Sequence, residues 1–311
     1  METIYKHIKP LEITSGQDGP HLLIIAGVHG DEYEPILAVQ RLIERFGTDE
    51  HISKGKLTLL AVVNEPAHAD DRRTGPDGLD LARICPGDPG GSISQQIARE
   101  VSDLIRTSDY LVDMHTGGKR YEIYPLSGYV LHTDQDILEK QRKMSQAFGL
   151  PVQWGTSPHL EGRTLSIARD AGVPAIYTEY GGGPSADQSI VDTLVRGCEN
   201  LMISLELIPD KNIHNPLPDF IVEDFRDESG HLQILYPAPQ DGRLTTVVSL
   251  GEMVERGQIL GKIENTGGGH ENIHAVEDGM VFILNRDLVV GKGVATAGVL
   301  PITSPGKITI S

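Results

Sequence analysis

Short runs of hydrophobic residues alternate with amphipathic segments along the first two-thirds of the chain. Leu22–Ala26 and Leu57–Val63 are continuous apolar runs, which are typical of buried β-strands. Between them, Pro35–Phe46 repeats its apolar residues at helical spacing and predicts an amphipathic helix with proline in its first turn. This alternation predicts an α/β fold with a mixed, mainly parallel sheet covered by helices.

The same alternation continues to residue 207. Strands are predicted at Tyr110–Met114 and Pro174–Thr178, and helices at Ser92–Ile105, Asp136–Phe148, Leu165–Ala171 and Gln188–Leu207. Ser92–Gln95 has the form of a capping box, which marks the start of its helix. Asn64–Pro89 is a polar stretch, and loops of this length in a compact domain are usually functional or disordered.

The last third of the chain has a different pattern, with short β-rich runs, many glycines and no helical period. Asp210–Asp219 contains two prolines and predicts a linker before this region. We therefore predict two domains, a catalytic domain over residues 1–209 and a small β-domain over residues 220–311.

Two short motifs occur twice in the small domain. APQDG at Ala238–Gly242 returns as AVEDG at Ala275–Gly279, and VERG at Val254–Gly257 returns as VGKG at Val290–Gly293. Such a repeat predicts a pseudo-symmetric, all-β sandwich or barrel built from two related halves.

Composition and charge exclude several classes of partner. The chain has 311 residues, a formal net charge of −17 and two cysteines. The negative charge argues against nucleic acid or an anionic membrane as partner, and no apolar run approaches the length of a membrane span. Two cysteines make no disulfide framework, and Met1–Pro10 has no signal-peptide core, so we expect a cytoplasmic protein. Homo-oligomerisation stays open.

Polar residues follow the carboxyl ends of four predicted strands. These residues are His29, Asn64, His115 and Glu179. In open α/β sheets ligands bind at this edge, so we expect the four side chains to converge.

His29, Glu32 and His115 have the chemistry of a metal site. Two imidazoles and one carboxylate are a common catalytic zinc set, which leaves a fourth position for water. His29 and Glu32 lie three residues apart in a glycine-rich turn, a spacing that also recurs by chance in surface loops. The downstream His115 completes the set, and we expect one Zn²⁺ per chain.

Glu179 and two arginines would complete an active site. A carboxylate outside the metal set can take a proton from a metal-activated water and pass it to a leaving nitrogen, and Glu179 is the candidate. Arg73 and Arg83 lie in the polar stretch and are candidates for stabilising an oxyanion and for holding a substrate carboxylate. The alternative is that both are solvated surface arginines.

Five motifs occur in a fixed order over roughly residues 20–207. They are HGDE, NEP, the spaced pattern R-TGP-DG-L-DLAR-ICPG, DMHTGG and TEYGGG. In this combination the chain resembles the zinc carboxypeptidase superfamily, and within it the succinylglutamate desuccinylase and aspartoacylase branch, which includes deacetylases of N-acetylated diamino acids. The trailing β-domain also fits that branch.

The resemblance implies a role for each candidate residue. Zinc would be held by the three candidate ligands, His29, Glu32 and His115. Glu179 would act as general base and acid, Arg73 would polarise the scissile carbonyl, and Arg83 would help to hold the substrate carboxylate. Asn64 is expected at the substrate because of its position after a strand. The implied reaction is removal of an acetyl- or succinyl-type group from a small N-acyl amino acid.

The chain departs from the family pattern at two positions. Ala82 stands where the DLNR motif has an asparagine, and Cys85 replaces an aromatic residue. The missing amide bears on substrate recognition, whereas neither change touches the metal set or Glu179.

Two other functions stay open. A metallocarboxypeptidase acting on small peptides is disfavoured by the β-domain, which in this branch narrows the entrance. A non-catalytic binding protein of the same fold is disfavoured by the intact ligand set, although Ala82 counts in its favour.

Overall fold

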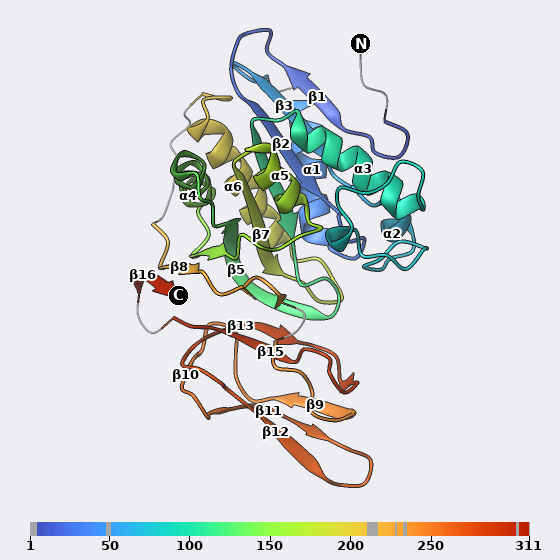
Figure 1. Cartoon of the computed structure of the whole chain (residues 1–311), viewed down its shortest axis with the longest axis vertical. Coiled ribbons are helices and arrows are strands. Elements are labelled where there is room, and N and C mark those ends of the chain that lie inside the picture. The colour runs from blue at the N-terminus through green and yellow to red at the C-terminus, as the bar shows by residue number, and fades with distance from the viewer. Residues whose placement is uncertain are drawn as a thin grey trace.

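A large mixed sheet forms the centre of the protein in this computed structural model, which describes residues 5–47, 51–209, 217–227, 229–232, 235–302 and 305–310 (Figure 1). The predicted linker Asp210–Asp219 lies for the most part outside the described residues. The strands along the main path of the sheet are β1 (Leu11–Thr14), β2 (His21–Ala26), β3 (Lys56–Leu60), β4 (Tyr110–His115), β5 (Tyr121–Val130), β6 (Val152–Thr156), β7 (Ala175–Gly181), β8 (Phe220–Asp224) and β16 (Gly306–Ile310).

The strand order is β1-β3-β2-β4-β7-β5-β6-β8-β16. Neighbours from β3 to β7 pair in parallel, as do neighbours from β5 to β16, whereas β1 with β3 and β5 with β7 are antiparallel. The prediction of a mixed, mainly parallel sheet is therefore confirmed.

Helices pack on both faces of the sheet. They are α1 (Tyr33–Phe46), α2 (Glu65–Ala69), α3 (Ile93–Arg106), α4 (Gln135–Phe148), α5 (Thr164–Ala171) and α6 (Gln188–Ser204), with a 3-10 turn η1 (Leu81–Arg83). Because side chains alternate along a strand, Leu22 and Ile24 of β2 pack with α1, α4 and α6, whereas Leu23 and Ile25 pack with α3 and α5. Two hydrophobic cores thus hold β2 rigid at the centre of the sheet.

The predicted elements are found with small shifts in their ends. The capping box at Ser92 is present and α3 follows it directly. β3 ends at Leu60, three residues before the predicted end, because the chain then turns into the segment that carries Asn64. The polar stretch Asn64–Pro89 is not a featureless loop, since it contains α2 and η1.

The C-terminal part is built from two facing sheets, as the repeat predicts. Its strands are β9 (Gly242–Thr246), β10 (Met253–Val254), β11 (Ile259–Glu264), β12 (His270–His274), β13 (Gly279–Asn285), β14 (Val289–Val290) and β15 (Ala297–Leu300). One sheet has the order β12-β11-β9-β14, and β10, β13 and β15 join the large sheet through β5. A shared apolar core lies between them.

The repeated motifs make equivalent contacts in the two halves. The short strand of each half pairs with the first strand of the other half, β10 with β13 and β14 with β9. Gly257 N donates to Ala275 O at 2.8 Å, and Gly293 N donates to Ala238 O at 2.9 Å. The two copies of the sequence repeat are therefore related by pseudo-symmetry, and each contributes its short strand to the sheet of the other.

β5 connects the two parts of the molecule. Its first residues pair with β13, with Ile123 opposite Ile283, and its later residues pair with β6 and β7. β8 and β16 belong to the large sheet, although they follow the predicted linker. The division into domains of residues 1–209 and 220–311 stays a prediction. β8 and β16, which lie in the second of these ranges, complete the large sheet of the first.

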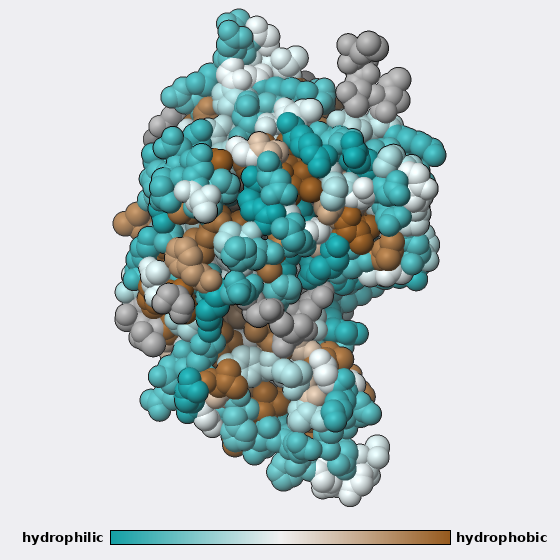
Figure 2. All heavy atoms as spheres, viewed as in Figure 1, coloured by the Kyte–Doolittle hydropathy of each residue, from teal (hydrophilic) through white to brown (hydrophobic). Residues whose placement is uncertain are grey.

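Polar side chains cover most of the face shown in Figure 2, and apolar ones occur there in small groups. Among the described helices, none combines the length and apolar character needed to cross a bilayer.

Candidate metal centre and active site

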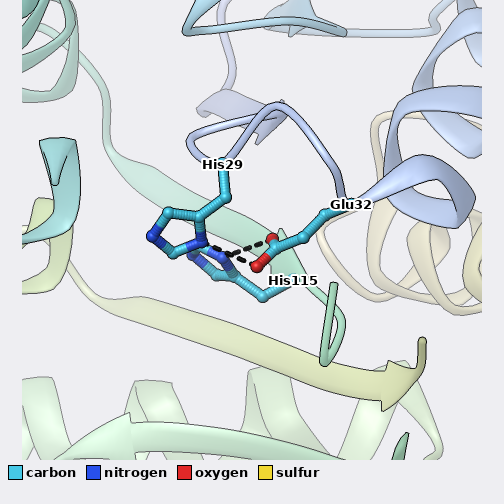
Figure 3. Close-up of side chains that lie close together, drawn as sticks. All are labelled: His29, Glu32 and His115. Carbon is cyan, nitrogen blue, oxygen red and sulfur yellow. Dashed lines mark hydrogen bonds and ion pairs between the residues drawn. The ribbon is translucent and has the colours of Figure 1, made fainter. Parts of the chain in front are cut away.

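Three buried side chains from separate elements converge at the carboxyl edge of the sheet (Figure 3). His29 lies in the loop after β2, Glu32 is the N-cap of α1, and His115 is the last residue of β4. One ligand atom from each lies within 4.8 Å of the other two. Nδ1 of His29 is 2.6 Å from Oε1 of Glu32, and Nδ1 of His115 is 2.8 Å from Oε2. The predicted convergence of these residues is therefore observed.

The fold places the three residues by strand pairing and by two close glycines. β2 and β4 are parallel neighbours with Ala26 opposite Met114, so the segments after both strands leave the sheet side by side. Gly27 has φ +67°, which favours glycine, and turns the chain away from the sheet. A Cβ at Gly30 would lie 2.1 Å from the backbone of Ala67, so only glycine lets this loop pack on α2.

A second carboxylate faces the far nitrogen of each histidine. Nε2 of His29 lies 3.2 Å from Oδ1 of Asp80, and Nε2 of His115 lies 3.2 Å from Oδ1 of Asp113. Thr164 donates to the other oxygen of Asp113 and fixes its orientation. The contact of Asp80 with His29 is a hydrogen bond, whereas Oδ1 of Asp113 makes none and contacts His115 as an ion pair. A carboxylate at this position favours a proton on Nε2 and leaves the Nδ1 lone pair for a metal.

The electrostatics of the cluster fit a bound cation. Burial raises the pKa of Glu32, but the two histidines outweigh this and hold its pKa well below the usual range. Burial lowers the pKa of His115, yet Asp113 and Glu32 raise it well above its ordinary value. Positive charge at the centre of these carboxylates is thus strongly favoured, and the buried His₂Glu donor set is one that zinc accepts.

Glu179 lies beside the cluster on β7, directly opposite His115 of β4. It lines the same cavity, and its Oε2 is buried with no hydrogen-bond partner among the described residues. Burial raises the pKa of Glu179 to about 8. A buried carboxyl group without a structural partner, next to a metal-ligand set, is a candidate acid or base.

The cavity in front of these residues has a volume of about 100 Å³. Its metal end is lined by the three candidate ligands and Glu179, and its wall is largely apolar, with Val130, Leu160, Leu165, Leu232 and Ile283. Leu232 and Ile283 come from the part of the chain after the predicted linker, so both parts of the molecule enclose the cavity.

Both predicted arginines line the cavity. Arg73 donates from Nε and Nη2 to Oδ2 of Asp80 at 3.1 and 3.0 Å, and its Nη1 is 4.0 Å from Oε1 of Glu32. Arg83 follows Ala82 in η1 and donates from Nη1 to the carbonyl of Ala82 at 2.7 Å. The structure therefore places Arg73 beside the metal cluster and Arg83 beside the departure from the family motif.

Asn64 does not lie among the residues that line the cavity. It is fully buried, accepts a hydrogen bond from Ala67 N as the N-cap of α2, and donates from Nδ2 to Val28 O. The structure therefore does not bring Asn64 together with the other cavity residues: these bonds use its amide to position the loop that carries His29.

Sequence reasoning missed Arg163, which precedes α5. Arg163 lines the cavity, and its Nε and Nη2 are buried without a partner among the described residues. The sequence offers only a glycine–arginine pair before a short helix, which does not distinguish a buried arginine from an exposed one.

Comparison with known proteins places the chain in a family. Residues 18–205 match the family described as succinylglutamate desuccinylase/aspartoacylase catalytic domain, and this span is more than half of the chain. The chain belongs to this family. The resemblance drawn from the five motifs is confirmed.

Several relatives of this family member have been described. N-alpha-acetyl-L-2,4-diaminobutyric acid deacetylase of Halomonas elongata is 30% identical over 258 residues, which cover 82% of this chain and 73% of that protein. A succinylglutamate desuccinylase/aspartoacylase from Rhodobacter sphaeroides is 26% identical, with a TM-score of 0.81 over 93% of this chain and 87% of that one. The product-bound ectoine utilization protein EutE (DoeB) from Ruegeria pomeroyi is 24% identical. It shares the fold, with a TM-score of 0.83 over 93% of this chain and 87% of that one.

The family match bears on how the desuccinylase/aspartoacylase site is built. The matched span carries the His29–Glu32–His115 cluster, Glu179 and all three arginines. Leu232 and Ile283, which close the cavity, lie beyond it. The candidate chemical groups of this site therefore all lie in the matched span, whereas its enclosure comes from both parts of the chain.

Proposed function

We propose that this family member is a zinc-dependent amidohydrolase that removes an acetyl- or succinyl-type group from a small N-acyl amino acid. The observation that carries the proposal is the cluster of His29, Glu32 and His115 beside the unpartnered carboxyl group of Glu179. Relatives named as deacetylases and desuccinylases support hydrolysis of an amide bond.

One zinc ion per chain would be held by Nδ1 of His29, Nδ1 of His115 and the carboxylate of Glu32. When bound, zinc polarises a carbonyl group and lowers the pKa of a water to about 7. Glu179 accepts a proton at its free Oε2 and delivers it to the amide nitrogen that leaves. Its burial and lack of a structural partner suit a group that must exchange protons during turnover.

Arg73 stabilises negative charge on the substrate oxygen. Its two bonds to Asp80 hold the guanidinium in one orientation, with Nη1 directed toward the metal cluster. Donors that are already oriented cost no reorganisation when charge develops, which is why such groups accelerate reactions. Arg83 contacts the substrate carboxylate further along the cavity.

The enclosure supports a small substrate. Leu232 and Ile283 close the cavity from the C-terminal part of the chain, which disfavours an extended peptide. We also propose a cytoplasmic location, since Cys85 and Cys198 are free, buried thiols.

The test is a substrate panel for the zinc-loaded protein. N-acetyl-L-amino acids, N-succinyl-L-amino acids and dipeptides are incubated with it, and free amine and released acid are measured. We expect amine release from N-acyl amino acids. Faster cleavage of dipeptides, or no amine from any N-acyl amino acid, would reject the proposed function.

A further inference from the structure

Arg163 is a cationic side chain with buried donors that the protein leaves unused. Its Nη1 donates to Gly230 O at 3.2 Å, while Nε and Nη2 are buried and have no partner among the described residues. Leaving charged donors buried and unpaired costs free energy, so native proteins rarely retain them without a use. Both unused donors belong to a side chain that lines the active-site cavity.

Arg163 and Arg83 are brought to the same part of the cavity by backbone packing. Gly162 O accepts from Cys85 N at 3.0 Å, and a Cβ at Gly162 would lie 2.3 Å from the carbonyl oxygen of Arg83. The segment before α5 therefore docks directly on η1. Ala82, Arg83 and Arg163 all line the cavity as a result.

In the part of the chain that the structure describes, neither guanidinium group forms an ion pair. Among the described residues, no carboxylate lies within 4.0 Å of either, whereas Arg73 is paired with Asp80. Burial, together with the charge of Arg83, lowers the pKa of Arg163 to about 10. Two neighbouring cations that lack a counter-ion form a site for an anion.

We infer that Arg163 and Arg83 together bind the carboxylate of the N-acyl amino acid, with Arg163 supplying the donors that are missing because position 82 is alanine. This inference rests on the proposed function and adds a specificity-determining residue to it. The planar guanidinium group of arginine can donate two parallel hydrogen bonds to a carboxylate, and Ala82, which lines the same cavity, offers no hydrogen-bond donor from its side chain. The substrate is then an N-acyl amino acid with a free carboxylate, not its neutral amide.

The test compares acids with their amides by calorimetry. The probes are N-acetyl-L-alanine, N-acetyl-L-leucine and N-acetyl-L-methionine with the three corresponding C-terminal amides, added to zinc-loaded Glu179→Gln protein to suppress turnover. We expect each acid that binds to bind more tightly than its amide. Replacing Arg163 by Met should weaken acid binding roughly ten- to a hundredfold, the value of a charge-assisted hydrogen bond, and leave amide binding almost unchanged.

Controls separate recognition from damage to the fold. Arg142→Met removes an arginine paired with Glu223 outside the cavity and should leave the acid–amide difference intact. If Arg163→Met does not fold, Arg163→Lys is used instead. It keeps the positive charge but lacks the paired guanidinium donors, so it should still lose part of the preference for the acid over the amide. Equal binding of acid and amide, no binding of any acid, or an acid preference that survives both Arg163 variants would overturn the inference.

A rescue variant gives a second, independent readout. In the Arg163→Met background, Ala82→Asn adds a neutral amide donor, and we expect it to restore acid affinity several-fold. No gain from Ala82→Asn would contradict a shared carboxylate site. Binding does not depend on turnover, so failure of the wild-type protein to release amine from any N-acyl amino acid of the substrate panel rejects the deacylase assignment without deciding the arginine pair.

Discussion

Asp80 and Asp113 favour the arrangement in which each candidate metal-binding histidine turns Nδ1 toward Glu32. Each lies 3.2 Å from an Nε2 atom, so both imidazoles present Nδ1 to Glu32. Neither aspartate would touch the metal, yet the tautomer and ring orientation of the candidate ligands depend on them.

Replacing Asp113 by Asn should weaken zinc binding about 10- to 100-fold, because the amide no longer stabilises the proton on Nε2 of His115. Competition with a chromophoric chelator measures the affinity. Asp103→Asn, on the exposed face of α3, is the control and should bind zinc like the wild type. Unchanged affinity in Asp113→Asn would remove this aspartate from the metal site.

Glu179→Gln should keep the zinc but lose turnover by at least about 10²-fold, the low end for acid–base catalysis. The reason is that the amide cannot accept a proton at the position next to His115. Metal analysis and initial rates on the same sample give both values. Glu122→Gln, on β5, should retain normal rates, and near-normal rates in Glu179→Gln would contradict its role.

The convergence of His29, Glu32 and His115 was predictable from sequence because these residues follow apolar strands, and the carboxyl ends of parallel strands share one edge. Asn64 has the same position after a strand, but the direction of its side chain depends on α2, which the polar sequence around it does not indicate. Arg163 was not predictable either, since its burial depends on Gly162 packing against η1.

At the scale of elements, Glu223 joins β8 to three neighbours. It accepts from Tyr129 of β5 at 3.1 Å, from Arg142 of α4 at 2.7 Å and pairs with Lys307 of β16 at 2.9 Å. The strand pairing of β8 and β16 at the edge of the sheet is thereby fixed from both sides.

Glu223→Gln should lower the free energy of unfolding by about 2 kcal/mol at pH 7, because hydrogen bonds to a charged group are lost. Burial raises the pKa of Glu223, but Lys307 and Arg142 outweigh this and lower it. A lowered folded-state pKa stabilises above the unfolded value near 4.5, and this stabilisation disappears as the pH falls below it.

Urea unfolding at pH 7 and pH 4 measures this difference. The deficit of Glu223→Gln should shrink at the lower pH, whereas the exposed Glu139→Gln should show little deficit at either pH. A deficit that is the same at both values would show that shape, not charge, accounts for the effect.

Sequence analysis did not predict β5, β8 or β16, because each has a weak local signal. β5 contains Pro125 and Gly128, which normally interrupt strands, and its two ends pair with different partners. β8 and β16 are short strands that join the sheet from beyond the predicted linker. By contrast, the repeat in the C-terminal part predicted its two-sheet form, because Asp-Gly turns recur in both halves.

At the scale of the whole molecule, the cavity contains positive charge that the overall composition does not indicate. The chain carries a formal net charge of −17, yet Arg73, Arg83 and Arg163 all line the cavity, together with the acidic groups of the metal-ligand cluster. The C-terminal part adds Leu232 and Ile283 as an apolar closure. The small anionic substrate that we propose would thus be accepted by local contacts and not by the field of the protein.

The most direct test of the central claim is the rate of amine release from N-acyl amino acids after metal removal and stepwise return of zinc. The account predicts no turnover in stripped protein, recovery that is complete at about one zinc per chain, and no recovery in His115→Ala, which lacks one of three ligands. Undiminished turnover in stripped protein, or full recovery in His115→Ala, would contradict it.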